Sequence, residues 1–381
     1  MAKTYIFGAG RFGQAICGKL KKYNDSIQIA GFIDNAPEKT GIQIDGVTVF
    51  SIHNITDEMK KSAEIFVTIL DWDCKVEIIN QLEQGRFSHV YLVHPNSWRD
   101  DAQLIEDGRV NSQYITELKK EGDMFVPVLP YLETHIMNGC LLNCKGCSHF
   151  SNLYRFDDAV PFESFQKDMI QLSQRCYIVK LRLLGGEPLM NPSLLNYLKI
   201  ARERFPYSDI RVATNGLLVL KLSEEVLQYL SESDIVLDIT IYQETYRFKE
   251  QLEDLLESYQ VRYQMDKENL QKFNKCLTLY GTHDGQRIIE KCSRKNCMIL
   301  KDGNIYRCPI AAYVPRFNEV FGQNIKTVSL CNIYHDGMDK LKELSLGREI
   351  KATETCNYCV EAVDFPWEVS HKPKMEEWLV Q

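Results

Sequence analysis

Three closely spaced cysteines constrain this chain more than any other feature. Cys140, Cys144 and Cys147 are separated by three and by two residues, and they follow an apolar run. This spacing suits one loop that wraps a corner of an iron–sulfur cluster, for which thiolates are the usual ligands. Three cysteines leave one of four irons without a protein ligand. The spacing therefore predicts a 4Fe–4S site with one position open for chemistry.

Zinc binding and disulfide formation are the alternatives for these cysteines. A structural zinc site usually has four protein ligands, so His149 or a distant residue would have to be the fourth. Disulfides are not expected in a chain of 381 residues that begins without a secretory signal. We therefore expect the thirteen cysteines to be free thiols or metal ligands.

Composition and charge narrow the possible functions. Apolar residues make up 44% of the chain and charged residues 25%, as in ordinary globular proteins, and the length predicts two or three domains. A net charge of -7 argues against a nucleic-acid partner, which would require a basic face. No apolar run reaches membrane-spanning length, and the sequence starts without a signal-peptide core. We expect a cytoplasmic protein with no membrane contact.

Residues 1–95 are predicted to form a Rossmann-like nucleotide-binding domain. A strand expected at 3–7 runs into a glycine turn and a helix, and a second strand then ends at an acidic residue. In such a unit the glycines permit a tight turn, the approach of a phosphate and close helix packing, and the acid meets a ribose hydroxyl. The residues predicted for these roles are Gly8, Gly10, Gly13 and Asp34.

Residues 31–49 resemble the small Rossmann-like domain of sugar acyltransferases and other polysaccharide-biosynthesis proteins. The resemblance implies that a nucleotide or nucleotide-sugar binds here. The alternative is a degenerate scaffold that binds no ligand. A polar segment, residues 96–129, is expected to be a linker, with Pro127 and Pro130 marking its end.

Residues 130–285 alternate between expected strands and helices, which predicts a parallel sheet, open or curled into a partial barrel. The strand expected at 178–184 ends in Gly185-Gly186-Glu187-Pro188, and the next strand, at 209–213, ends in Thr214-Asn215-Gly216. The overall fold class is therefore α/β.

The cysteine spacing and the Gly-Gly-Glu-Pro turn, in this order and at strand ends, resemble the radical S-adenosylmethionine (SAM) superfamily. The resemblance implies a partial (β/α)6 barrel, a 4Fe–4S cluster on the three cysteines, and SAM as cosubstrate. Such proteins cleave SAM to methionine and a 5′-deoxyadenosyl radical, which removes a hydrogen from the substrate.

Residue roles follow from the same resemblance. The two glycines would let the backbone approach SAM, and the acid would receive its ammonium group. The SAM-binding residues implied are Gly185, Gly186, Glu187, Pro188 and Asn215. The superfamily usually has an aromatic residue before the third cysteine, where this chain has Gly146, and His149 and Phe150 are candidates to replace it.

Strand periodicity predicts a polar interior for the barrel. Lys180 and Arg182 share one strand face, and Val236, Asp238, Thr240 and Tyr242 share another. Lys180, Arg182 and Arg211 together would favour a phosphate or carboxylate in a water-filled cavity. The alternative is that the charges pair with one another.

Residues 286–381 carry a second set of cysteines and a hairpin turn at Asp302-Gly303-Asn304. The pattern resembles the auxiliary-cluster domain called twitch, the short form of SPASM, and implies one auxiliary 4Fe–4S cluster. The candidate ligands are Cys292, Cys297, Cys308, Cys356 and Cys359. Structural zinc on the last four is the alternative. Cys276 is expected to be a core or incidental residue, and the aromatic tail around Trp367 and Trp378 is expected to serve packing.

The function predicted from these features is that of a radical SAM enzyme which oxidises or epimerises a sugar-type small molecule, free or nucleotide-linked. An electron donor such as flavodoxin or ferredoxin would be its partner. The alternatives are a peptide-modifying radical SAM maturase and a non-catalytic iron–sulfur or zinc protein that senses nucleotides.

Overall fold

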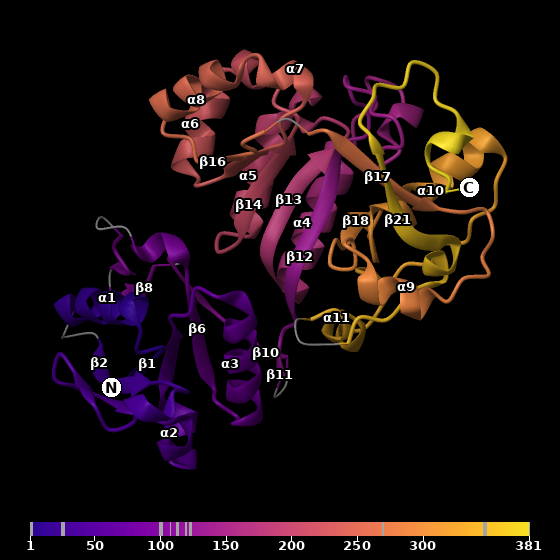
Figure 1. The fold of residues 1–381 in the computed structure, drawn as a ribbon. Helices are drawn as coiled ribbons and strands as arrows, with labels where there is room; N and C mark the ends of the chain where they lie inside the picture. The colour runs from indigo at the N-terminus through magenta and orange to yellow at the C-terminus, as the bar shows by residue number, and fades with distance from the viewer. Residues whose placement is uncertain are drawn as a thin grey trace. The chain divides into compact units, whose positions relative to one another are not determined.

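The computed structural model describes the chain apart from residues 1–2, 24–26, 99–101, 107, 112–113, 119, 122–123, 269, 346–348 and 381. The chain divides into two compact units, residues 1–128 and 129–381. Each unit is mixed α/β and contains parallel strands (Figure 1). Within the described residues, no helix is long and apolar enough to cross a bilayer.

The first unit contains a seven-stranded sheet of order β3-β4-β2-β1-β5-β6-β9. Its five central strands pair in parallel, and β3 and β9 close the two edges in antiparallel fashion. The strands are β1 Lys3–Phe7, β2 Gln28–Ile33, β3 Gln43–Ile44, β4 Val47–Phe50, β5 Glu64–Val67, β6 His89–Val93 and β9 Ile115–Glu117. The helices are α1 Arg11–Leu20, α2 Asp57–Ser62 and α3 Trp72–Gln84.

The segment expected to be a linker, residues 96–129, contributes structure to the first unit. Its strand β9 pairs with β6, which covers an edge that would otherwise expose unpaired backbone groups. Two short hairpins lie on either side of β9 in the sequence: β7 Ile105–Glu106 with β8 Arg109–Val110, and β10 Lys120–Glu121 with β11 Met124–Phe125. The boundary of the unit therefore falls at residue 128 rather than at 95.

The second unit contains an eight-stranded sheet of order β16-β15-β14-β13-β12-β18-β19-β20. Strands β13 to β16 pair in parallel, as do β12 and β18. The strands are β12 Val128–Met137, β13 Tyr177–Gly185, β14 Asp209–Thr214, β15 Val236–Ile239, β16 Tyr263–Met265, β18 Ile299–Lys301, β19 Asn304–Tyr306 and β20 Cys331–Asn332. Because β18 to β20 continue this sheet, residues 286–381 share one compact unit with the barrel segment.

The remaining elements of this unit are helices and one two-stranded ribbon. The helices are α4 Phe162–Arg175, α5 Leu194–Arg204, α6 Glu224–Glu232, α7 Gln243–Tyr246, α8 Lys249–Ser258, α9 Gly285–Lys291, α10 Pro309–Phe321 and α11 Met338–Glu343. The ribbon pairs β17 Lys272–Leu277 with β21 Cys359–Pro366 in antiparallel fashion. It joins two segments that are far apart in the sequence.

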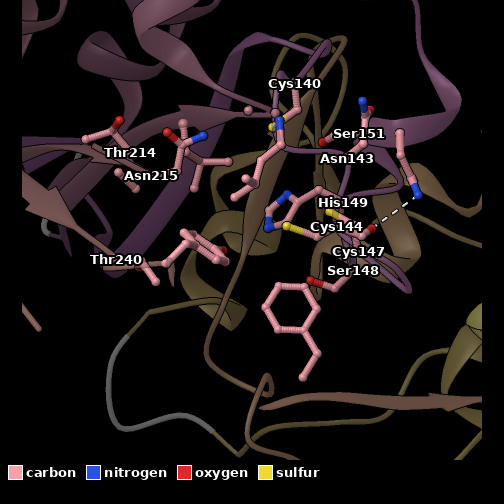
Figure 2. Close-up of a pocket in the computed structure, with 18 of the residues that line it drawn as sticks. Cys140, Asn143, Cys144, Cys147, Ser148, His149, Ser151, Thr214, Asn215 and Thr240 are labelled. Atoms are coloured by element: carbon pink, nitrogen blue, oxygen red, sulfur yellow. Dashed lines mark hydrogen bonds between the residues drawn. The ribbon is translucent and has the colours of Figure 1, made fainter. Parts of the chain in front are cut away.

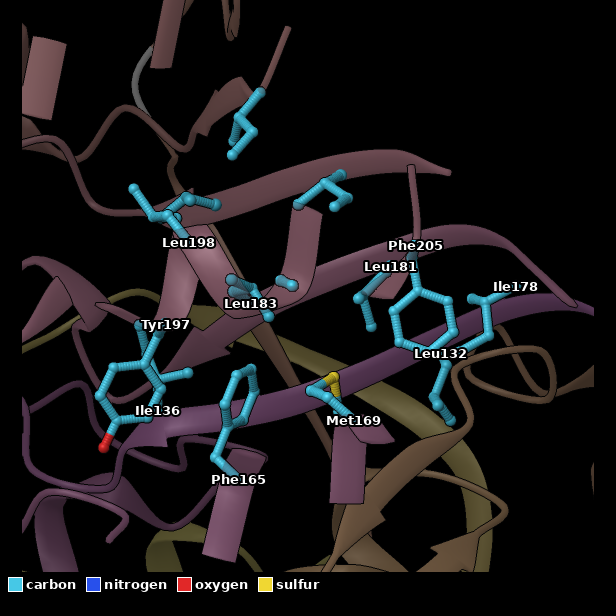
Figure 3. Packing of buried hydrophobic residues seen from close by; sticks show 14 of the residues in the cluster. Leu132, Ile136, Phe165, Met169, Ile178, Leu181, Leu183, Tyr197, Leu198 and Phe205 are labelled. Atoms are coloured by element: carbon cyan, nitrogen blue, oxygen red, sulfur yellow. The ribbon is translucent and has the colours of Figure 1, made fainter. Parts of the chain in front are cut away.

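One face of the sheet packs against helices α4 and α5 (Figure 3). Phe165 and Met169, one helical turn apart on α4, are buried together with Leu181 and Leu183 of β13. Arg182, which lies between these leucines, must then point to the opposite face. The alternation along β13 therefore separates an apolar core from a polar wall.

Candidate active site

The cysteine loop follows the carboxyl end of β12 and lines a cavity of about 240 Å³. Residues just beyond β13, β14 and β15 complete the lining, so that the ends of neighbouring strands meet at one place. Figure 2 shows Cys140, Cys144 and Cys147 around this cavity, together with His149 and Asn215. All three cysteines predicted as cluster ligands are thus brought together.

The glycine turn lies directly against the backbone that leads into the cysteine loop. The amide of Gly186 donates to the carbonyl of Met137 at 2.8 Å, and that of Glu187 donates to the carbonyl of Gly139 at 3.0 Å. A Cβ atom on Gly185 would lie 1.7 Å from the Met137 oxygen, and one on Gly186 would lie 2.1 Å from the Gly139 oxygen. Glycine is required at both positions because backbone packs on backbone.

The Glu187 carboxylate is fully buried and connects two strand ends. It accepts hydrogen bonds from the Thr214 hydroxyl at 2.6 Å, from the Asn215 amide at 2.9 Å and from the Leu189 amide at 3.1 Å. Burial raises the pKa of Glu187 to about 7. This side chain is not part of the cavity lining, and its hydrogen bond with the Asn215 amide fixes the backbone there. Pro188 starts the short 3₁₀ turn Pro188–Met190 and is buried.

Asn215 offers the cavity an unused hydrogen-bond donor. Its Oδ1 accepts from the Leu217 amide at 3.0 Å, whereas its buried Nδ2 has no partner in the described part of the chain. A buried polar atom without a partner marks a place where a ligand acceptor fits. The residue therefore suits the carboxylate or hydroxyl groups that the resemblance assigns to SAM.

The cysteine thiols are set for metal binding rather than for exposure to solvent. Burial raises the pKa of Cys140 to about 12 and raises that of Cys144 further above its usual value. Two N–H groups nevertheless point at sulfur: the Leu142 amide is 3.4 Å from Cys140 Sγ, and the Trp367 indole Nε1 is 3.2 Å from Cys144 Sγ. Such donors favour thiolate, the form that ligates metal, so metal binding would release protons.

Glu133 and Arg182 form a polar wall of the same cavity. The Arg182 guanidinium lies 3.2 Å from Glu133, 2.8 Å from Asp238 and 3.0 Å from the Tyr131 hydroxyl. Desolvation raises the pKa of Glu133 despite the neighbouring guanidinium. Arg182 and Glu133 thus pair with each other, and both side chains still line the cavity.

The other two cations expected in the cavity lie outside its lining. Lys180 and Arg211 each pair with Asp209, at 4.0 Å and 2.9 Å respectively, and neither belongs to the lining residues. The anion-binding cluster of three cations is therefore reduced to Arg182, because Asp209 engages the other two.

Steric contacts explain why this chain has a glycine at position 146. A Cβ there would lie 2.7 Å from the Glu377 carbonyl and 2.9 Å from the Phe365 ring, so no aromatic side chain fits. Of the two candidate replacements, Phe150 is fully buried away from the cavity, whereas His149 lines it. His149 is held by a contact of 2.9 Å between its Nδ1 and Nε2 of His135.

A second cavity, of about 540 Å³, gathers a different set of cysteines from the one predicted. Four of the predicted ligands line it, and a fifth thiol comes from Cys276 on β17, which contacts Cys359 on the paired strand β21. Cys297 does not line it and instead lies within electrostatic range of Glu133 and Arg182. The cysteines that line the cavity are Cys276, Cys292, Cys308, Cys356 and Cys359.

The structure therefore leaves Cys297 outside the lining of this cavity and places Cys276 within it. Among the described residues, no three or more His, Cys, Asp or Glu side chains form a group that could hold a single metal ion. A 4Fe–4S cluster binds each cysteine through a different iron, so its ligands need not converge on one point. The zinc set that included Cys297 is not assembled at this cavity.

In the first unit, the glycine turn is tightly packed and braced by Asp34. A Cβ on Gly13 would lie 1.8 Å from the Gly8 carbonyl, and Gly8 has φ of +112°. Asp34 accepts from the amides of Ala9 and Ala36, each at 2.9 Å. It also pairs with Lys39 at 2.9 Å, so the carboxylate predicted to meet a ribose is already engaged by the protein. Gly10 precedes α1 with open space around its Cα.

One family model matches a segment in the middle of the chain. Residues 132–258 match the family model described as a 4Fe–4S single cluster domain. The GTP 3′,8-cyclase of Alkaliphilus metalliredigens is 28% identical over 104 residues, which are 27% of this chain and 32% of that protein. The match thus spans about a third of this curated relative.

Comparison with solved structures gives partial matches at low identity. SuiB of Streptococcus suis bound to S-adenosylmethionine is 17% identical and covers 38% of this chain and 34% of its own, with a TM-score of 0.30. BtrN in complex with AdoMet and 2-DOIA is 16% identical and covers 61% of this chain and 92% of its own, with a TM-score of 0.36. The family match and the assembled cysteines together support a 4Fe–4S cluster domain in the middle of the chain.

Proposed function

We propose that this protein is a radical SAM enzyme that removes a hydrogen atom from a hydrophilic, sugar-type substrate and thereby oxidises or epimerises it. The observation that carries the proposal is one cavity at the carboxyl ends of β12 to β15, which joins the three cysteines to the glycine turn. The two motifs are far apart in the sequence, yet both line the same space. Strand ends of this kind are where α/β folds bind ligands.

Each part of the chain has a defined task in this proposal. Cys140, Cys144 and Cys147 would hold the cluster, which with SAM bound supplies the 5′-deoxyadenosyl radical. Gly185 and Gly186 keep side chains out of the space where SAM would lie. Asn215 donates its free N–H to the cosubstrate, and the buried Glu187 holds the backbone of Asn215 in place.

The polar wall supports a hydrophilic substrate. Opposite the apolar core, the cavity is lined by Glu133, Arg182, His149 and Thr240. Polar groups at fixed positions in a cavity give orientation and specificity to a ligand that can hydrogen-bond with them. A polyhydroxylated molecule matches this wall better than an apolar side chain does, which favours a sugar-type substrate over a peptide.

The second cavity and the glycine turn of the first unit also have roles in this proposal. The five thiols of the second cavity are one more than a 4Fe–4S cluster needs, and we assign an auxiliary cluster to four of them. The first unit would bind a nucleotide or nucleotide-sugar at Gly8, Gly10 and Gly13. An electron donor such as flavodoxin or ferredoxin would reduce the enzyme.

Deuterium transfer tests the substrate class. Reconstituted protein is incubated without oxygen with SAM, dithionite and one of several candidates: deuterated hexoses, deuterated UDP-sugars, deuterated cyclitols, deuterated GTP or a deuterated peptide. We expect a sugar or cyclitol to place deuterium in 5′-deoxyadenosine. Deuterium transfer from the peptide or the GTP ribose alone would contradict the sugar assignment. The triple Cys140→Ala, Cys144→Ala and Cys147→Ala variant is the control and is expected to transfer no deuterium.

A further inference from the structure

The C-terminal segment of the chain lies against the cysteine loop. We call residues 365–378 the strap. Its backbone forms an isolated antiparallel bridge with the loop, and two backbone hydrogen bonds of 2.9 Å and 2.7 Å extend this contact. The contacts are the Cys144–Val369 bridge, the Lys145 amide on the Glu368 carbonyl, and the Ser370 amide on the Asn143 carbonyl. The strap therefore does more than fill space at the end of the chain.

The strap brings one N–H group to a predicted cluster ligand. The indole Nε1 of Trp367 donates to Cys144 Sγ at 3.2 Å. The hydroxyl of Tyr242, whose ring lies 5.2 Å from that of Trp367, also hydrogen-bonds with the same sulfur. Cys144 is only 8% exposed, and hydrogen bonds in such surroundings are electrostatically stronger than in water.

Room for the strap depends on Gly146. The Phe365 ring and the Glu377 carbonyl occupy the space that any side chain at this position would need. The glycine between the second and third cysteines and the aromatic strap are therefore two parts of one arrangement. The strand β21, which leads into the strap, starts at Cys359 of the second cavity, so both cysteine groups are connected through it.

Hydrogen bonds to ligand sulfur are among the factors that set the reduction potential of an iron–sulfur cluster. Reduction adds negative charge to the cluster and its thiolates, and an N–H donor stabilises the more negative state. We propose that Trp367 is a positioning residue that raises the reduction potential of the cluster held by Cys140, Cys144 and Cys147. This inference rests on the proposed function, because it requires a cluster on Cys140, Cys144 and Cys147, which we call the triad.

Trp378 is a matched control in the same strap. Its indole Nε1 also donates a hydrogen bond, at 2.8 Å, but the acceptor is the backbone carbonyl of Cys147 rather than a sulfur. Trp367→Phe and Trp378→Phe each remove one indole N–H and retain an aromatic ring. Only the first removes a donor from a ligand sulfur.

The test is a reductive titration followed by electron paramagnetic resonance on reconstituted full-length protein. The triad signal is the one absent from a variant with Cys140→Ala, Cys144→Ala and Cys147→Ala. We expect Trp367→Phe to retain its iron and to shift the triad potential to a more negative value, with less shift or none in Trp378→Phe. Tyr242→Phe, which removes the second donor, should shift it in the same direction and serves as the test if Trp367→Phe fails to assemble a cluster.

An unchanged triad potential in Trp367→Phe, or an equal shift in both tryptophan variants, would overturn the inference and leave the proposed function intact. Wild-type protein that shows no triad signal at all would instead overturn the proposed function, and the inference with it. The potential is the deciding quantity because a role in packing alone would lower thermal stability without moving it.

Discussion

Replacing Arg182 with methionine should destabilise the second unit strongly. The guanidinium is the cation that faces Glu133 and Asp238, and the Glu133 side chain is only 5% exposed. Removing one partner of a buried ion pair leaves an uncompensated charge and costs about 3–5 kcal/mol. In a unit of this size, about 1 kcal/mol corresponds to about 2–4 °C in unfolding temperature, so we expect a decrease of about 6–20 °C.

The loss should depend on pH in a defined direction. Burial already holds the pKa of Glu133 above its ordinary value, and Arg182 opposes this rise. Without the guanidinium the pKa of Glu133 rises further, so the folded state binds a proton more tightly than the unfolded state does. The penalty is absent in acid and grows as pH increases from the ordinary pKa of a glutamate towards the raised one, so Arg182→Met should lose more stability at neutral pH than in acid.

Differential scanning calorimetry on anaerobic protein measures both effects, since the two units can unfold as separate transitions. Lys180→Met is the matched control, because Lys180 lies two residues away on the same strand. Its contact with Asp209 is 4.0 Å long and both side chains are about a third exposed. Such a pair contributes about 1 kcal/mol or less. Equal shifts for the two variants, or no pH dependence for Arg182→Met, would refute the reasoning.

Three further predictions concern single residues. Cys297→Ser should retain wild-type iron, whereas Cys308→Ser should lose about half of it, as counted by iron and sulfide assays; equal losses would contradict the assignment. Gly185→Ala should prevent tight SAM binding in equilibrium dialysis, since its Cβ would meet backbone at 1.7 Å. Asp34→Asn should lower the free energy of unfolding of the first unit at neutral pH by roughly 1–3 kcal/mol before solvent screening reduces it, as measured by thermal denaturation. Burial raises the pKa of Asp34, but its hydrogen bonds and Lys39 outweigh burial and hold that pKa low, so the difference between the variant and the wild type should vanish in acid.

The parts of the site that could be predicted from the sequence are local in the chain. The spacing of Cys140, Cys144 and Cys147 and the Gly185-Gly186 turn each lie within a few residues, so their geometry follows from short-range rules. The alternation along β13 likewise placed Arg182 opposite the buried leucines. Strand ends in a parallel sheet then bring these local motifs together.

What could not be predicted depends on contacts between distant segments. Cys276 carries no spacing signal, and only the pairing of β17 with β21 places it beside Cys359. Cys297 has a suggestive spacing, yet the chain that leads into β18 places it toward Glu133 instead. Trp367 was expected to serve packing, and its contact with Cys144 spans 223 positions in the sequence. An unusual Gly146 was the one local sign that another segment occupies this space.

Formation of 5′-deoxyadenosine tests the central claim most directly. Protein reconstituted without oxygen is mixed with SAM and dithionite, and the product is quantified by mass spectrometry. Wild-type protein should be coloured, contain iron and sulfide at about eight each per chain, and cleave SAM. The triple Cys140→Ala, Cys144→Ala and Cys147→Ala variant should keep about half the iron and form no product. Colourless wild-type protein that leaves SAM intact, or equal product from the triple variant, would contradict the account.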